Sequence, residues 1–305
     1  MELNQLRVFY HVAKFRSFSL AAEALFVTRP AVSISVRHLE EHYAVRLFER
    51  SGKKIALTNA GEILFAYAEK VFSLVKEADN RLKDLKGNFS GTLKISSGLT
   101  IGTYYLAPLI NTFRKKYPAV EIQMEVKNKK GVIEDILFLQ NDLGFLGNVP
   151  TNANLVVTPL WREDLVVIAS KPHSFGRKPS ILPSQLSGPP FILREKGSGT
   201  REYIEGRLNQ HRVSINTVME IGSDEAIKRA VMVGLGISIV PKGVVEKEVR
   251  RGLIKTYRLS DENLVLEYFM IRHKDKYISN LISAFMEMAL EFNPRSANRV
   301  EKFSP

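Results

Sequence analysis

The chain has 305 residues, of which 45% are hydrophobic and 25% charged, and it contains no cysteine. This length predicts two or three domains of an ordinary globular protein. The lack of cysteine excludes disulfide bonds, cysteine-ligated metal sites and thiol catalysis.

The formal charge is +12 at pH 7, from 44 basic and 32 acidic residues. A charge of this sign favours anionic partners, namely nucleic acid, acidic membrane surfaces or small anions, although it also serves solubility alone. No apolar run reaches the roughly 18–20 residues that a membrane span needs, and the first residues lack the pattern of a secretory leader. We therefore expect a cytoplasmic protein with no membrane partner.

Three helices are expected in the first 45 residues, where apolar residues recur at helical spacing. Ser19 is expected to cap the second of them, over residues 20–26, and Thr28 to cap the third. Pro30 then fits just inside the third helix, where its missing N–H costs nothing. A helix, a short turn and a second helix form the DNA-binding arrangement in which the later helix enters the major groove.

The third helix and the basic turn after it carry the candidate contacts to DNA. Arg29 and Arg37 can reach guanine or phosphate, and Ser33 can bond either type of base. Two short β-prone pieces, 47–49 and 54–57, flank the basic turn and predict a wing that lies on the phosphate backbone. The alternative is a generic three-helix bundle with a basic loop. The candidate DNA-binding residues are Thr28, Arg29, Pro30, Ala31, Ser33, Ile34, Arg37, Arg50, Lys53 and Lys54.

A long helix is expected next, over residues 59–88. Its apolar residues fall at spacings of three and four, with one slip near Ala78: Leu64, Tyr67, Val71, Leu74, Ala78, Leu82 and Leu85. This pattern is typical of a coiled-coil seam, and about 28 residues would span roughly 42 Å. The helix either joins two copies of the chain or packs on the chain's own body.

Strands alternate with helices from residue 92 onward, which predicts a parallel sheet with helices on both faces. The chain is expected to leave a first lobe near Trp161 and to return near Tyr268. Lobe I would then comprise 92–161 and 268–293, and lobe II would comprise 162–267. Two crossings suit a hinged binding module that resembles periplasmic binding proteins. The tail, 294–305, is polar and expected to fray.

Hydroxyl, amide and basic side chains gather at predicted strand ends and helix starts. Free N–H groups at helix starts, together with hydroxyls, favour a carboxylate, sulfate or phosphate. We therefore expect a small anionic effector there, unless these hydroxyls only cap helices. The candidate residues are Thr100, Thr103, Lys129, Asn148, Ser198, Gly199 and Thr200.

Known catalytic motifs are missing from the sequence. None of the six histidines has the HExxH spacing, and no GxxxxGK[ST] or Gly-x-Ser-x-Gly motif occurs. We expect no catalytic residue, no metal and no cofactor. Two alternatives to a sequence-specific DNA-binding protein with a ligand site are an enzyme that uses the α/β cleft and an architectural protein that binds DNA without sequence preference.

The run AAEALFVTRPAVSISVRHLEEHYAVRLFERSGKKIALTNAGE resembles the N-terminal domain of the LysR-type transcriptional regulators. Farther along, YYLAPLINTFRKKYP, NDLGFLG and SDEAIKRAVMVGLGISIVP resemble the effector domain of that family, so the resemblance covers nearly the whole chain. Arg29 and Ile34 depart from the family pattern at positions that could alter the DNA sequence read. Gly144 departs from it in a buried strand, which indicates that a ligand or a neighbouring side chain approaches closely.

The resemblance implies an α/β protein with a winged helix-turn-helix domain (1–58), a dimerisation linker helix (59–88) and a two-lobed, periplasmic-binding-protein-like effector domain (89–293). It also implies a sequence-specific transcriptional regulator, not an enzyme, whose effector lies between the lobes. The implied partners are pseudo-palindromic double-stranded DNA, a small effector, further copies of the chain in a homodimer or homotetramer, and RNA polymerase.

Overall fold

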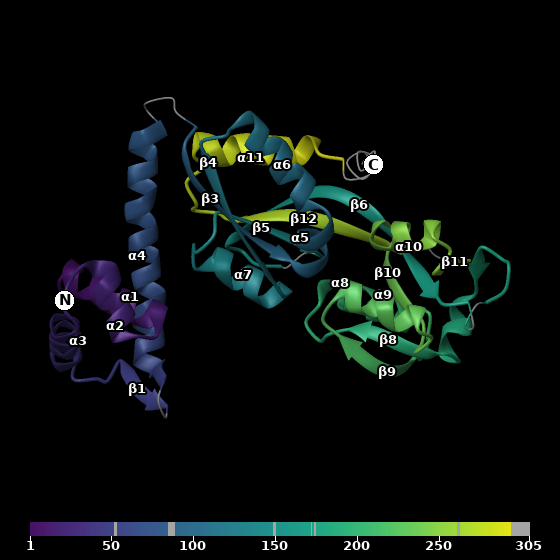
Figure 1. Ribbon diagram of the computed structural model, residues 1–305, viewed down its shortest axis with the longest axis horizontal. Coiled ribbons are helices and arrows are strands. Elements are labelled where there is room, and N and C mark those ends of the chain that lie inside the picture. The colour runs from purple at the N-terminus through teal and green to yellow at the C-terminus, as the bar shows by residue number, and fades with distance from the viewer. Residues whose placement is uncertain are drawn as a thin grey trace. The chain divides into compact units, whose positions relative to one another are not determined.

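The computed structural model describes residues 1–51, 54–84, 89–148, 151–171, 173, 175–260 and 263–293 (Figure 1). The chain divides into two compact units: Met1–Leu85 with Phe138–Gln140, and Lys86–Leu137 with Asn141–Pro305. The predicted tail, 294–305, and the end of the predicted linker, 85–88, lie outside the described residues.

The first unit has three short helices, a two-stranded hairpin and a long helix, as predicted (Figure 1). Its elements are α1 (Leu3–Phe15), α2 (Phe18–Leu25), α3 (Arg29–Tyr43), β1 (Phe48–Ser51), β2 (Lys54–Leu57) and α4 (Asn59–Asp84). The two strands pair antiparallel, with Phe48 opposite Leu57. This arrangement is a winged helix-turn-helix followed by a long helix.

Hydroxyl caps fix the starts of α2 and α3. The Thr28 hydroxyl accepts a hydrogen bond from the Ala31 N–H at 3.4 Å, which confirms the predicted cap. For α2 the predicted cap is wrong, because Ser17 and not Ser19 accepts from the Leu20 N–H, at 3.3 Å. Ser17 has the extended backbone of a capping residue, whereas Ser19 lies inside the first turn.

The core of the first unit fixes the hairpin against the helices. Leu39 of α3 and Leu47, just before β1, are buried together with Phe9 of α1. The Glu40 carboxylate accepts hydrogen bonds from the N–H groups of Leu47, at 2.8 Å, and Phe48, at 3.3 Å. The start of the wing is therefore tied to α3, the predicted recognition helix.

The second unit is built on an eight-stranded sheet with the order β4-β3-β5-β12-β6-β11-β7, in which β10 also pairs with β6; β8 and β9 form a separate pair. The strands are β3 (Gly91–Gly98), β4 (Val120–Lys127), β5 (Leu143–Gly147), β6 (Leu155–Ala169), β7 (Ser180–Ile181), β8 (Pro190–Arg194), β9 (Asn216–Ile221), β10 (Ser238–Pro241), β11 (Lys255–Leu259) and β12 (Val265–His273). The helices are α5 (Leu99–Tyr104), α6 (Leu106–Lys116), α7 (Lys129–Leu137), η1 (Pro183–Ser187), α8 (Gly199–Gln210), α9 (Asp224–Met232), η2 (Lys242–Val245), α10 (Glu246–Arg250) and α11 (Asn280–Glu291).

The sheet is mixed, which corrects the prediction of a parallel sheet. β3 runs parallel to β4 and β5, and β8 runs parallel to β9. β12 is antiparallel to both β5 and β6, because it returns from the far lobe. Figure 1 shows two groups of elements in the second unit, connected by the long strands β6 and β12. The first group, which we call lobe I, comprises β3–β5 with α5–α7 and α11. The second group, lobe II, comprises β8–β10 with α8–α10.

The close approach predicted at Gly144 is made by side chains. A Cβ on Gly144 would lie 2.7 Å from Ile271 Cγ1 and 2.9 Å from Ile136 Cγ1, so any larger residue would collide with this part of the core. Gly144 therefore permits α7 and β12 to pack closely on β5. Packing of neighbouring side chains, and not contact with a ligand, explains why a glycine stands at position 144.

Candidate functional site

The helix α3 has one buried face and one exposed face. Val32, Val36 and Leu39 are at most 4% exposed and pack on the helices beneath. Of the predicted DNA contacts, Thr28, Arg29, Pro30, Ala31, Ile34 and Arg37 are exposed and Ser33 is half-buried. The structure thus leaves all seven at least partly accessible, at the start of α3 and along its face. Arg50 and Lys54 belong to the hairpin strands, whereas Lys53 lies outside the described residues.

The helix α4 carries apolar side chains on two sides. One set faces the first unit's core, where Phe65 and Phe72 lie 5.6 and 5.1 Å from the Tyr10 ring. A second set is exposed: Ile63, Tyr67, Leu74, Val75 and Leu82 are between 54 and 65% exposed. The predicted seam is therefore divided, because its half-buried members Leu64 and Val71 pack on the chain's own core. An exposed apolar row of this kind marks an interaction surface.

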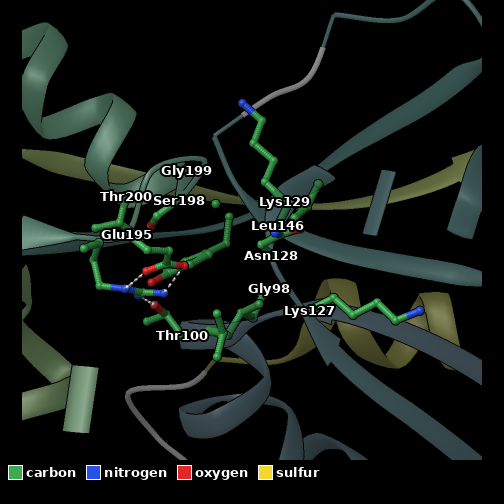
Figure 2. A pocket seen from close by; sticks show the side chains of 15 residues that line it. Gly98, Thr100, Lys127, Asn128, Lys129, Leu146, Glu195, Ser198, Gly199 and Thr200 are labelled. Carbon is green, nitrogen blue, oxygen red and sulfur yellow. Dashed lines mark hydrogen bonds and ion pairs between the residues drawn. The ribbon is translucent and has the colours of Figure 1, made fainter. Parts of the chain in front are cut away.

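A small cavity lies between the two lobes of the second unit, at the ends of β3, β5 and β8 (Figure 2). Its volume is about 30 Å³. Five of the predicted effector residues line it: Thr100, Lys129, Ser198, Gly199 and Thr200.

Two of the predicted effector-binding residues, Thr103 and Asn148, do not line this cavity. Thr103 is exposed and lines a separate groove of about 870 Å³, because it lies three residues beyond Thr100 on α5, roughly 4.5 Å along the helix axis. Asn148 lies beside the cavity, with its Cβ 3.6 Å from where a Cβ on Gly199 would stand. Its φ of 70° is in the left-handed region, which asparagine tolerates.

The centre of the site is Arg194, which the sequence analysis did not select. Its side chain is only 4% exposed, at the end of β8. The guanidinium donates from Nη1 to Asp224, at 3.1 Å, and from Nε and Nη2 to the two oxygens of Glu195, at 2.9 and 3.1 Å (Figure 2). Burial alone would lower the pKa of Arg194, but Asp224 and Glu195 outweigh it and raise that pKa above its usual value. Arg194 therefore stays charged.

Thr100 connects the lobes through this cluster. Its hydroxyl donates to Asp224 at 2.6 Å and accepts from Arg194 Nη1 at 3.0 Å. Because Thr100 belongs to lobe I while Arg194 and Asp224 belong to lobe II, these bonds hold the two lobes together. The Thr100 hydroxyl is thus engaged within the protein, which differs from the predicted role as a ligand contact.

The lysines near the cavity are also paired. Lys129 Nζ of lobe I lies 2.7 Å from the Glu202 carboxylate of lobe II and forms an ion pair between the lobes. Lys127 Nζ contacts Glu125 and Asp135. In Figure 2 the side chains of both lysines extend away from Glu195.

The start of α8 faces the cavity. Ser198 is the residue before the helix and is buried, yet its hydroxyl does not cap α8. The first N–H groups of any α-helix lack partners within the helix, and those of α8 belong to Gly199 and its successors. Gly199 packs directly on the carbonyl oxygen of Gly147, and a Cβ at this position would collide with it. At Gly199, therefore, the two lobes are in close contact, and the helix start at the same residue is favourable to an anion.

The described residues contain no group of three or more His, Asp or Glu side chains that could hold a metal ion. Within the same part of the chain, no single helix is long and apolar enough to cross a membrane. The helices α2 and α3, which meet at a bend of 108°, together have the length and composition of a span, and only these two properties point to one.

Two family profiles match the chain. The profile described as a bacterial regulatory helix-turn-helix protein of the lysR family matches residues 3–62, and the one described as a LysR substrate binding domain matches residues 86–293. The HTH-type transcriptional activator CmpR of Synechocystis is 34% identical over 285 residues, which cover 93% of each chain.

Solved structures share the fold. A substituted form of full-length OxyR from Pseudomonas aeruginosa has a TM-score of 0.77 at 23% identity and covers 100% of this chain and 99% of its own. The regulatory domain of Synechocystis CcmR, solved in complex with 2-PG, has a TM-score of 0.62 at 27% identity and covers 66% of this chain and 97% of its own.

Proposed function

The chain belongs to the LysR family of DNA-binding transcriptional regulators, and on that premise we propose that it binds a specific DNA sequence under the control of a small anionic effector held between its two lobes. Members of the family are regulators controlled by small effectors, and the chain is accordingly a regulator and not an enzyme. The anionic nature of the effector, its binding residues and the DNA contacts are what we propose.

The observation that carries the effector proposal is the shared lining of the inter-lobe cavity. Lobe I supplies Thr100 and Lys129, and lobe II supplies Arg194, Ser198 and Thr200. A ligand bound to both sets of residues changes the energy of the lobes' arrangement, as effector control requires. The α8 start and the buried guanidinium both favour an anion. The CcmR regulatory domain in complex with 2-PG supports a small ligand in a domain of this fold.

For DNA, we propose that α3 enters the major groove of double-stranded DNA. Arg29, Ser33 and Arg37 would reach base edges or phosphate, and the neighbouring small residues would permit close approach. Arg50, Lys53 and Lys54 of the wing would contact the phosphate backbone. The support for this arrangement is the exposed face of α3 opposite its buried one.

We further propose that the chain assembles through the exposed apolar row of α4 into a homodimer or a homotetramer. Two copies of α3 would then read a pseudo-palindromic site whose halves lie one DNA turn, about 34–36 Å, or a multiple of it apart. The regulator would act in the cytoplasm, where DNA and RNA polymerase, a further proposed partner, are found.

The effector proposal is tested by calorimetric titration of full-length protein with small oxyanions, including 2-PG and inorganic phosphate. We expect at least one to bind wild type, and Thr200→Val to weaken that binding by about tenfold, as for the loss of one hydrogen bond to a charged group. Thr217→Val, at an exposed position of β9, is the matched control and should not change the affinity. Equal affinities of all three proteins, or no binding to any of them, would count against this site.

A further inference from the structure

Arg194 is held by two carboxylates that differ in how firmly they are fixed. The Asp224 side chain is 3% exposed, lies in the first turn of α9 and also accepts a hydrogen bond from the Thr100 hydroxyl. The Glu195 side chain is 27% exposed, and among the described residues its hydrogen bonds are made to Arg194 alone. Glu195 is therefore the partner that can leave.

The two carboxylates use different edges of the guanidinium. Asp224 and Thr100 occupy Nη1, whereas Glu195 occupies Nε and Nη2 with two parallel N–H···O bonds. Two parallel bonds of this kind are also how an arginine binds a free carboxylate or phosphate. Glu195 thus occupies the edge of Arg194 that an anionic ligand would use.

The cavity geometry leads to the same conclusion. Arg194, Glu195 and the α8 start line one space of about 30 Å³, in which the Glu195 carboxylate lies against the Nε and Nη2 edge of Arg194. Moreover, Arg194 with Glu195 and Asp224 carries one net negative charge, which repels a second anion. A swing of the Glu195 side chain away from Arg194 would remove a carboxylate from this space and leave Arg194 and Asp224 with zero net charge.

We propose that Glu195 is an internal substitute for the effector's anionic group, and that an incoming carboxylate or phosphate replaces it on the Nε and Nη2 edge of Arg194. This inference rests on the proposed anionic effector and deepens it, because it names the receptor side chain and the group that competes with the ligand. The Nη1 edge keeps Thr100 and Asp224, so the exchange leaves the bonds between the lobes in place.

The competition has a quantitative consequence. A ligand's apparent affinity falls by the fraction of protein whose site is free to bind it. If Glu195 occupies Arg194 for more than about nine-tenths of the time, wild type binds anions at least about tenfold more weakly than a protein without this competitor. Glu195 would therefore raise the effector concentration at which the regulator responds.

Three variants of the full-length protein separate exchange from a simple change of charge. Glu195→Gln removes the competing carboxylate. Glu195→Asp keeps the negative charge but shortens the side chain by one methylene, so that it no longer reaches Arg194 with both oxygens. Glu202→Gln removes a carboxylate near the same cavity, where it pairs with Lys129, and leaves Arg194 untouched. Thermal unfolding midpoints close to that of wild type confirm that each variant is folded.

The measurement is calorimetric titration with inorganic phosphate at low salt. Exchange predicts that Glu195→Gln binds phosphate at least about tenfold more tightly than wild type, that Glu195→Asp also binds more tightly, and that Glu202→Gln gains much less. The proposed exchange is wrong if Glu195→Gln binds phosphate as weakly as wild type or more weakly. It is also wrong if Glu202→Gln gains as much affinity for phosphate as Glu195→Gln does. Neither result contradicts the proposed anionic effector. If no protein binds phosphate, and none of the other oxyanions binds wild type, the anionic effector fails together with the exchange.

Discussion

Two buried tyrosines at the joint between the lobes lack hydrogen-bond partners among the described residues. The hydroxyls of Tyr105 and Tyr268 are both buried and unpaired, and their rings lie 5.5 Å apart. Burial raises the pKa of each phenol well above 10.0, and the charges of Glu163 and Asp224 add to this effect. Both tyrosines therefore stay neutral in the folded protein at pH values where an unfolded chain would ionise them.

The sign of the resulting pH dependence follows from these raised pKa values. Below pH 10 the tyrosines bind the same protons in the folded and unfolded states, and their contribution to stability is fully present. Above pH 10 the unfolded chain loses protons that the folded protein keeps, so the free energy of unfolding falls by about 1.4 kcal/mol per pH unit for each tyrosine. Urea unfolding between about pH 9 and 11.5 should show a shallower decline for Tyr268→Phe than for wild type. If the free energy of unfolding declined equally with pH in both proteins, Tyr268 would ionise as readily in the folded protein as in the unfolded chain.

On α3 and the wing, single side chains are expected to differ in what they contribute to DNA binding. Arg29→Ala should cost about 1–3 kcal/mol at one base pair and relax the choice of base there. Lys54→Ala should weaken all sites alike and lower the slope of log affinity against log salt by about one. Electrophoretic mobility shifts on a site and its single-base variants, over a range of salt concentrations, distinguish the two. A uniform loss from Arg29→Ala would argue against base contact by that residue.

At the scale of single elements, the exposed row on α4 should hold the assembly together. Leu74 and Leu82 are 57 and 65% exposed, and burying such side chains between two copies gains about 1.5–3 kcal/mol each. Leu74→Glu is expected to shift the protein toward monomers in sedimentation equilibrium, because a charge would be buried in the interface. Glu62→Lys changes a charge that lies about 120° around α4 from Leu74 and should leave the assembly unchanged. An assembly that is the same for wild type and Leu74→Glu would mean that α4 does not form the interface.

The elements of the first unit follow closely from local sequence signals. Thr28 with Pro30 marks the start of α3 because the cap and the fixed φ of proline act within one turn. Two serines compete for the start of α2, and local chemistry does not choose between Ser17 and Ser19. In the second unit, the sequence pattern indicates β6 only from Asp164 onward, although the strand begins at Leu155. Its first half is specified by pairing with β12, about 110 residues later, and not by its own pattern.

At the scale of the whole molecule, the sequence identifies the start of α8 but not the charged centre of the site. Gly199 and Thr200 are recognisable because glycines and hydroxyls before a helix are a local signal. Arg194 contacts Thr100 across 94 positions and Asp224 across 30, and a single sequence does not reveal such pairs. The available signal was a charged residue at the carboxyl end of a buried strand, where ligands of α/β sheets bind.

The proposed effector cavity lies at the joint between the two lobes. The links of Thr100 with Asp224 and of Lys129 with Glu202 lie at the margin of the cavity, so a ligand there acts on both lobes. Coupling between an effector and a second site is typically about 1–3 kcal/mol and is reciprocal for binding. The effector should therefore change DNA affinity by the factor by which DNA changes effector affinity.

The central claim is that this chain reads a specific DNA sequence. The most direct measurement is selection of DNA fragments from the source genome by the full-length protein at about 150 mM salt, followed by footprinting. We expect enrichment of a few fragments that share a pseudo-palindrome, with protection of half-sites about one DNA turn apart or a multiple of it. Binding without enrichment, which disappears as salt rises, would contradict it, because contact with phosphates alone behaves in that way.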